Sequence, residues 1–195
     1  MTQPNRDICM FLPWDSEFFG VRIARARDHR LTAVRTGAML DWWRHEKIDC
    51  LYFLGDADDG ETVALAEQHD FQLVDIRMTL KLDTRRAQPQ FGSSPHVRSA
   101  TADDVEALKA IARASHLDSR FFYDTHFSRE RCATLYAVWI EKSCNGYADA
   151  VLVFDDGDGA AGYITCHLDA ADGGSIGLVG VAQDQQGKGA GGALV

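Results

Sequence analysis

The sequence has few of the residues and runs on which several protein classes depend. Its five cysteines are odd in number and widely spaced, with no Cys-x-x-Cys pair, which argues against a structural zinc site and a disulfide framework. No apolar run approaches the ~20 residues of a membrane helix, and the N-terminus lacks a signal-peptide core. We therefore expect reduced thiols, no metal and a cytoplasmic protein that does not bind a membrane.

Positive charge is scarce as well. The formal net charge is −9 over 195 residues, and acidic residues outnumber basic ones on both sides of His96. Because such a surface repels a phosphate backbone, nucleic acid is not an expected partner. The hydrophobic share of 46% is that of an ordinary globular enzyme and supports a sizeable core, in one large domain or two small ones.

The residues before Thr84 predict an N-terminal α/β half with the order β-α-β-α-β, from alternating apolar residues and helical apolar stripes. The expected strands are 18–26, 50–54 and 71–82, and the expected helices are 31–43 and 62–69. Two prolines, a glycine and few apolar residues then mark a linker. The expected domains are therefore the N-terminal half at 1–84, the linker at 85–96 and a second domain at 97–195.

The second domain is predicted to contain one sheet and at least two capped helices. Thr101 begins a helix with Asp104 at its third position, a variant of the capping box, and Ser128 is the expected N-cap of another helix. The expected strands are 97–100, 148–154, 161–167 and 176–181. The acidic turn at 155–158 lacks the spacing of a calcium loop and indicates a hairpin. The predicted fold class is α/β (α+β), with a mixed, largely antiparallel sheet flanked by helices.

Glycines crowd the segment after the last expected strand, at Gly187, Gly189, Gly191 and Gly192. A strand, a glycine-rich turn and a helix start together aim several backbone N–H groups and a helix dipole at a phosphate. Side chains would block that approach. The arrangement therefore predicts a phosphorylated cofactor.

Two phosphate loops of other families fit this segment less well. A nucleoside-triphosphate loop needs Ser or Thr after its lysine, but Lys188 is followed by Gly189. Gly187, Gly189 and Gly192 satisfy G-x-G-x-x-G, the dinucleotide fingerprint, yet five polar or small residues separate the strand from the first glycine. No acidic residue follows about 20 positions later, as that fingerprint requires. A nicotinamide or flavin oxidoreductase stays open as an alternative, as does a non-catalytic acyl-CoA-binding module.

A third pattern, Gln or Arg followed by two residues, Gly, one residue and then Gly or Ala, is met in full. The matching residues are Gln186, Gly187, Lys188, Gly189, Ala190 and Gly191, with Val179, Gly180 and Val181 on the strand just upstream. This pattern resembles the acetyl-CoA-binding motif of the GNAT superfamily of N-acetyltransferases. The resemblance implies that acetyl-CoA is the co-substrate, that the loop amides, through Gly192, hold its pyrophosphate, and that the strand backbone pairs with its pantetheine arm.

Two further segments resemble the dTDP-fucosamine acetyltransferase group within that superfamily. They are 12–20, which opens the chain, and the region of 119–121 and 136–141 around the second helix. This resemblance implies transfer to the 4-amine of a nucleotide-linked amino sugar. The loop at 116–127 would then shape the acceptor pocket, with Arg120 for an anion and Phe121, Phe122 and Tyr123 for a flat ring. The expected partners are thus a small-molecule amine and, in a homodimer, a second copy of the chain.

Such a transfer is the attack of a free amine on a thioester carbon, with a proton supplied to the departing thiolate. A backbone N–H near 179–181 would polarise the carbonyl. No carboxylate lies at 175–181, and Asp172 has the character of a solvated loop residue, so we expect water-mediated deprotonation of the amine.

The proton donor is not expected among the residues of this sequence. The family's usual acid is a tyrosine that would lie beyond Val195, so the second domain is expected to be incomplete at its C-terminal end. None of the tyrosines at 123, 136, 147 and 163 is assigned that role. His116 and His126, which flank the acceptor loop, are expected as surface histidines at helix ends.

Overall fold

A computed structural model describes residues 8–83, 94–169 and 173–195 of the chain. Compact packing divides the chain into two units, with the boundary between Leu73 and Val74. Most of the linker expected at 85–96 lies outside the described residues.

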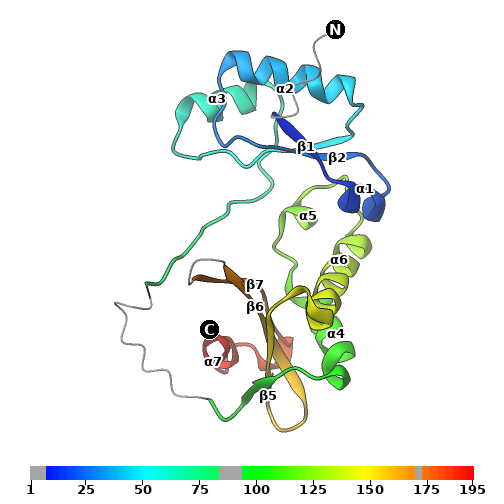
Figure 1. The fold of residues 1–195 in the computed structure, drawn as a ribbon, viewed down its shortest axis with the longest axis vertical. Coiled ribbons are helices and arrows are strands. Elements are labelled where there is room, and N and C mark those ends of the chain that lie inside the picture. Colours follow the sequence, from blue (N-terminus) through cyan, green and yellow to red (C-terminus); the bar gives the residue numbers. More distant parts are fainter. Residues whose placement is uncertain (1–7, 84–93, 170–172) are drawn as a thin grey trace. The chain divides into compact units, whose positions relative to one another are not determined.

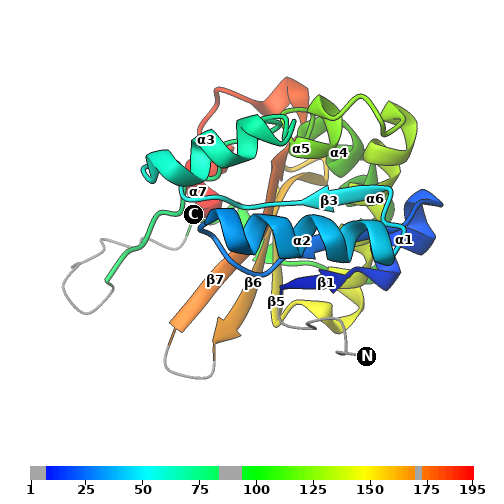
Figure 2. The same ribbon diagram turned by 90° about the horizontal axis from the view of Figure 1, so that it is seen from above.

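The first unit is a three-stranded sheet with helices. Its elements are β1 (Cys9–Phe11), α1 (Pro13–Phe19), β2 (Ile23–Ala26), α2 (Ala33–His45), β3 (Cys50–Tyr52) and α3 (Gly60–Gln68). β2 pairs antiparallel with β1 and parallel with β3. Figures 1 and 2 show α2 and α3 side by side over one face of this sheet. The buried core between them consists of Ile8, Cys9, Ala26, Leu31 and Met39.

The strand expected at 18–26 forms only at its end, in β2. Its first residues belong to α1, which begins with Pro13 at its first turn and ends at Gly20 in the left-handed conformation, with φ +74°. A proline at the start and a glycine just past the end are strong helix boundaries. These two signals outweigh the short-range alternation of apolar residues that suggested a strand.

The strand expected at 71–82 is wrong for this structure, in which residues 71–83 form neither helix nor strand. The alternation itself is present, but no sheet edge in the described residues supplies the inter-strand hydrogen bonds that a strand needs. The apolar side chains of this segment are consequently exposed, among them Leu73, Ile76, Met78, Leu80 and Leu82.

The second unit carries the predicted sheet. Its strands are β4 (Val97–Ser99), β5 (Ala150–Asp155), β6 (Ala160–Asp169) and β7 (Gly173–Val181), and its helices are α4 (Val105–Ser115), α5 (Arg120–Tyr123), α6 (Arg129–Lys142) and α7 (Ala190–Leu194). The strands lie in the order β4-β5-β6-β7 and every pair is antiparallel. The predicted α+β class and its antiparallel sheet are confirmed. Figure 1 shows α4 and α6 on one face of the sheet and α7 on the other.

Both predicted helix caps in this unit are present. The Ser128 hydroxyl accepts a hydrogen bond from the Arg131 N–H at 3.2 Å. The Asp104 carboxylate accepts one from the Thr101 N–H at 2.8 Å, and Arg98 donates two more to it. Ionised acceptors make strong hydrogen bonds, and Arg98 holds the pKa of Asp104 well below its usual range. The start of α4 is thereby fixed to β4.

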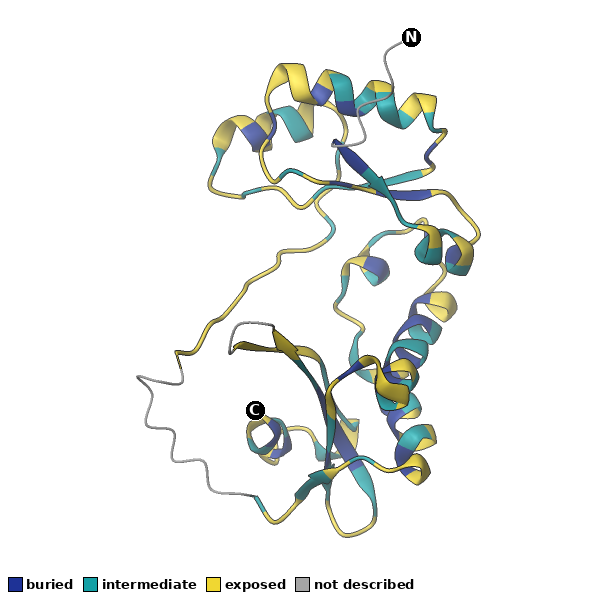
Figure 3. Cartoon of the chain, in the orientation of Figure 1, coloured by how far each residue is buried: buried dark blue, intermediate teal, exposed yellow. Residues whose placement is uncertain are grey.

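The core of the second unit lies between its sheet and the helices α4 and α6. Figure 3 shows the buried residues along the sheet-facing sides of both helices and in the middle of the strands. The most buried apolar side chains there are Leu108, Ile111, Leu135, Ile140, Val153, Tyr163 and Ile164. In the ranges that the structure describes, no helix is both long and apolar enough to cross a membrane.

Candidate functional site

The sheet topology argues against the alternative of a dinucleotide-binding site. A dinucleotide fingerprint works where a parallel strand leads into a helix at the edge of a doubly wound sheet. Here the strand before the glycines, β7, is antiparallel to β6, in a sheet whose described strands are all antiparallel. The crevice that an oxidoreductase of that class needs is therefore not formed by this unit.

β7 has an irregularity halfway along its length. Ile164 pairs with Val179 but Cys166 pairs with Ile176, so Thr165 lies opposite two residues, Gly177 and Leu178. This is a β-bulge. The Thr165 side chain is fully buried, and its Oγ1 accepts the Leu178 N–H at 2.8 Å. The bulge thus removes one N–H of β7 from the ladder with β6 and satisfies it with a side chain.

The other edge of β7 is open within the described residues, because β6 is its one neighbour there. In an edge strand, every second residue directs its N–H and C=O away from the sheet. These groups can pair with an extended ligand that contains amides. The predicted cofactor residues Val179, Gly180 and Val181 end this strand.

Packing alone explains why position 180 is a glycine. A Cβ at this position would lie 2.7 Å from Cε1 and 3.0 Å from the hydroxyl oxygen of Tyr163, which is closer than van der Waals contact allows. Tyr163 is fully buried on β6. The glycine therefore makes room for the tyrosine ring, whether or not a cofactor lies on the strand.

His116, at the C-cap of α4, contacts the same tyrosine. Its Nε2 lies 2.8 Å from the Tyr163 hydroxyl, and its ring stacks on Tyr136 with centroids 4.4 Å apart. Burial lowers the pKa of His116 to about 4 and raises the pKa of Tyr163 and Tyr136. The expectation of a surface histidine is wrong here: His116 is a half-buried, neutral residue that binds Tyr163. His126 is exposed, with Nδ1 2.8 Å from Asp124.

The glycine loop follows β7 through a short turn. Gly187 and Gly189 have φ of +74° and +89°, a conformation that favours glycine. Apart from the adjoining residues of the chain, no atom lies within 4 Å of the position that a Cβ would take on either residue, so no other part of the fold fills the space above them. The Gln186 amide donates to the Val181 carbonyl at 3.2 Å and ties the loop back to the strand end. Lys188 is exposed, and its ammonium donates to Gln185 at 3.4 Å.

The last part of the motif fixes α7 against the sheet. Ala190 and Leu194 are buried, and a Cβ on Gly162 of β6 would lie 3.3 Å from the Leu194 side chain. A Cβ on Gly191 would meet Val181 at 3.9 Å, whereas the space around Gly192 is open. The structure thus brings the strand end, the loop and the helix start together around Val181.

The expected acceptor residues separate into core and surface. Phe121 is only 1% exposed and packs against the rings of Phe127 and Trp139, so its ring belongs to the core rather than to the substrate contact that we expected. Arg120 is exposed, and its guanidinium lies 4.3 Å over the Phe121 ring. Phe122 is half-buried beneath the guanidinium of Arg129, at 5.2 Å.

Arg129 and a polar row on β6 are the residues that the sequence reasoning missed. The strand expected at 161–167 already implied that Tyr163, Thr165 and His167 share one face, since side chains alternate along a strand. In the structure all three reach across to β7, where Gly180 and Gly177 leave space. The signal was therefore the match between three polar residues on one strand and two glycines on its neighbour.

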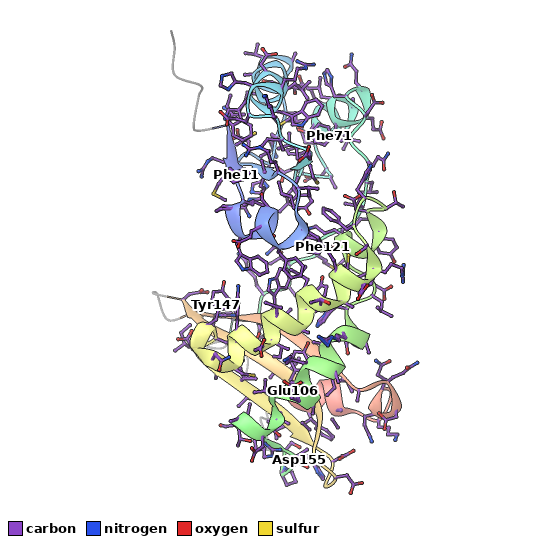
Figure 4. The ribbon with its side chains drawn as sticks, turned by 90° about the vertical axis from the view of Figure 1, so that its right-hand side faces the viewer. Phe11, Phe71, Glu106, Phe121, Tyr147 and Asp155 are labelled. Atoms are coloured by element: carbon purple, nitrogen blue, oxygen red, sulfur yellow. The ribbon has the colours of Figure 1, made fainter. Side chains whose placement is uncertain are left out.

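The acidic turn is a hairpin, as expected, and Figure 4 shows its Asp155 at the far end of the unit from Tyr147. Asp155 accepts a hydrogen bond from Arg98 at 2.8 Å. Within the described residues, no group of three or more His, Cys, Asp or Glu could hold a metal ion. Asp172, weighed as a base, lies outside the described residues.

No model of a known protein family matches the chain, and no curated protein matches it either.

Proposed function

We propose that this protein is an acyl-CoA-dependent N-acetyltransferase that moves an acetyl group from acetyl-CoA to a primary amine. One observation carries the proposal: the open, bulged strand β7 leads through a short turn into a loop with two left-handed glycines that no other part of the fold covers. The strand edge suits the amides of a pantetheine arm. The loop suits the pyrophosphate of the same cofactor.

The phosphate end would be bound by the loop. Successive backbone N–H groups in left-handed turns form concave anion sites, and no residue beyond the immediate chain neighbours lies within 4 Å of the Cβ position of Gly187 or Gly189. Lys188 adds an exposed positive charge on the loop. In a chain of net charge −9, this local arrangement is what favours a cofactor with phosphates.

The reacting end would lie on β7 near its bulge. The amine nitrogen attacks the thioester carbon, the new C–N bond forms and the C–S bond breaks. A proton leaves the amine, and one is taken up by the CoA sulfur. The negative charge that develops on the carbonyl oxygen is stabilised by a backbone N–H of the strand edge. Orientation of both reactants along one strand supplies a large part of the rate enhancement.

We propose a nucleotide-linked amino sugar as the acceptor, bound at 116–127. The guanidinium groups of Arg120 and Arg129 each lie over an aromatic ring of α5. Guanidinium groups bind phosphates with two parallel hydrogen bonds. We propose a cytoplasmic location for this reaction, with which the five free cysteines agree.

The test is calorimetry of the full chain with acetyl-CoA, CoA, NADH and FAD, followed by a transfer assay. We expect acetyl-CoA and CoA to bind and NADH and FAD not to bind. With dTDP-4-amino-4,6-dideoxygalactose as acceptor, release of the CoA thiol should require both substrates. Binding of NADH or FAD in place of acetyl-CoA would refute the proposed cofactor. Acetyl-CoA binding without transfer to this acceptor would refute the proposed acceptor, and absence of transfer to every primary amine tested would favour the non-catalytic module.

A further inference from the structure

His167 lies beside Gly177, one of the two bulge residues of β7. It is half-buried on β6, and its side chain crosses to the neighbouring strand. A Cβ on Gly177 would lie 2.8 Å from His167 Nε2 and 2.8 Å from Thr165 Oγ1. The imidazole nitrogen therefore occupies the space directly over the backbone of a bulge residue.

The ring of His167 is held in place by an aromatic contact. Tyr147, in the turn that follows α6 (Figure 4), packs edge-to-face against it with centroids 5.5 Å apart. The carboxylate of Asp149, on the adjoining turn, accepts the Leu168 N–H at 2.7 Å. In the described part of the chain, neither ring nitrogen of His167 has a hydrogen-bond partner, whereas the Nε2 of His116 binds Tyr163.

We propose that His167 is the general base of the acetyl transfer and accepts the proton of the acceptor amine. This inference rests on the proposed function, because it places the thioester on β7 at the bulge. The proton moves from the amine nitrogen to Nε2 as the C–N bond forms. The imidazolium then returns a proton to solvent while the departing thiolate takes one up, so the neutral imidazole is restored. Water-mediated deprotonation, our expectation from the sequence, is replaced by a direct step.

The residues around His167 favour this role over the other candidates. Histidine is the side chain that most often acts as a general base. His116 is engaged with Tyr163 and is kept neutral by burial, with a pKa of about 4 that makes it a weak proton acceptor. Strand β7 carries no carboxylate. Because Gly177 has no side chain, a base on β6 can reach over the neighbouring strand β7.

Histidine NMR of the full chain tests where His167 lies relative to the acyl group. The ring carbons of the histidines are labelled with 13C, and the His167 signal is assigned by its loss in His167→Gln. Acetyl-CoA should shift this signal and the loop amides of 187–189, while the signal of the exposed His96, which lies beside Asp155 in the same unit, stays in place. A shift of the loop amides without a shift of His167 would overturn the base assignment. No shift at all would refute acetyl-CoA binding, and with it the proposed function.

Kinetics then separate a base from a structural residue. With dTDP-4-amino-4,6-dideoxygalactose, His167→Gln should lower kcat at least 100-fold, a typical loss for a general base, with unchanged acetyl-CoA affinity. Gly177→Ala should also lower kcat, because its Cβ displaces the imidazole, whereas Gly174→Ala on the same strand should not. Full kcat in His167→Gln, or an equal loss of acetyl-CoA affinity, would overturn the inference. If wild type binds acetyl-CoA without transfer, the proposed acceptor fails, and the NMR shift alone decides whether His167 faces the acyl group.

Discussion

Tyr163 occupies the space that a side chain at position 180 would need, since a Cβ on Gly180 would lie 2.7 Å from the tyrosine ring. The contact joins the two strands β6 and β7 at the point where the candidate cofactor strand ends. The same tyrosine binds His116 at the end of α4. Packing of one buried ring thus positions both the strand edge and the start of the loop at 116–127.

Gly180→Ala should destabilise the protein by about 1–3 kcal/mol, because overpacking forces the tyrosine ring or the strand to move. Urea unfolding measures the loss. Gly192→Ala is the matched control, since the space around Gly192 is open and alanine favours a helix. If Gly180→Ala is as stable as wild type, the close packing between Gly180 and Tyr163 is wrong.

Stability should depend on pH through His116. Its folded pKa of about 4 lies below the ordinary value of 6.5, so the unfolded chain binds more protons between these two values. Stability should therefore be complete above pH 6.5 and fall by up to about 3 kcal/mol as the pH drops to 4. Urea midpoints at both pH values measure this, and His116→Gln should flatten the difference. An unchanged pH dependence of stability in His116→Gln would contradict this assignment.

The Asp104 carboxylate joins the cap of α4 to Arg98 on β4. Asp104→Ala should cost about 2–4 kcal/mol, because it removes a cap and leaves a guanidinium with fewer partners. Thermal or urea unfolding measures the loss. Asp103→Ala, at the exposed neighbouring position, should change stability by less than about 0.5 kcal/mol. Equal effects of the two substitutions would show that this network does not stabilise the fold.

Helix caps were the most predictable features of the sequence, because Thr101, Asp104 and Ser128 act through their own local backbone. Strands were harder to predict from the sequence. The alternation at 71–82 is as clear as that of β6, yet the described residues offer it no partner edge, and pairing is a non-local condition. Among the site residues, too, local features were the predictable ones. The glycine loop could be predicted because its residues are adjacent in the sequence. The environment of His116 and the burial of Phe121 could not, because they depend on contacts with β6 and α6.

Arg120→Ala should raise the acceptor KM at least tenfold while the affinity for acetyl-CoA stays the same, if the guanidinium binds an acceptor phosphate. Steady-state kinetics with dTDP-4-amino-4,6-dideoxygalactose and calorimetry with acetyl-CoA measure the two effects. Arg113→Ala, on the exposed side of α4, is the control. A parallel loss of acetyl-CoA affinity would make Arg120 a cofactor or structural residue instead.

The most direct test of the account is the affinity of Gly189→Asp for acetyl-CoA, measured by calorimetry on the full chain. The substitution places a side chain and a negative charge in the open space where the pyrophosphate would lie. Gly157→Asp, at an exposed hairpin glycine with φ +103°, introduces the same residue under similar backbone strain. We predict at least tenfold weaker binding, about 1.4 kcal/mol, for Gly189→Asp and wild-type binding for Gly157→Asp. Equal acetyl-CoA affinity in wild type and in a folded Gly189→Asp protein would contradict the assignment of this loop.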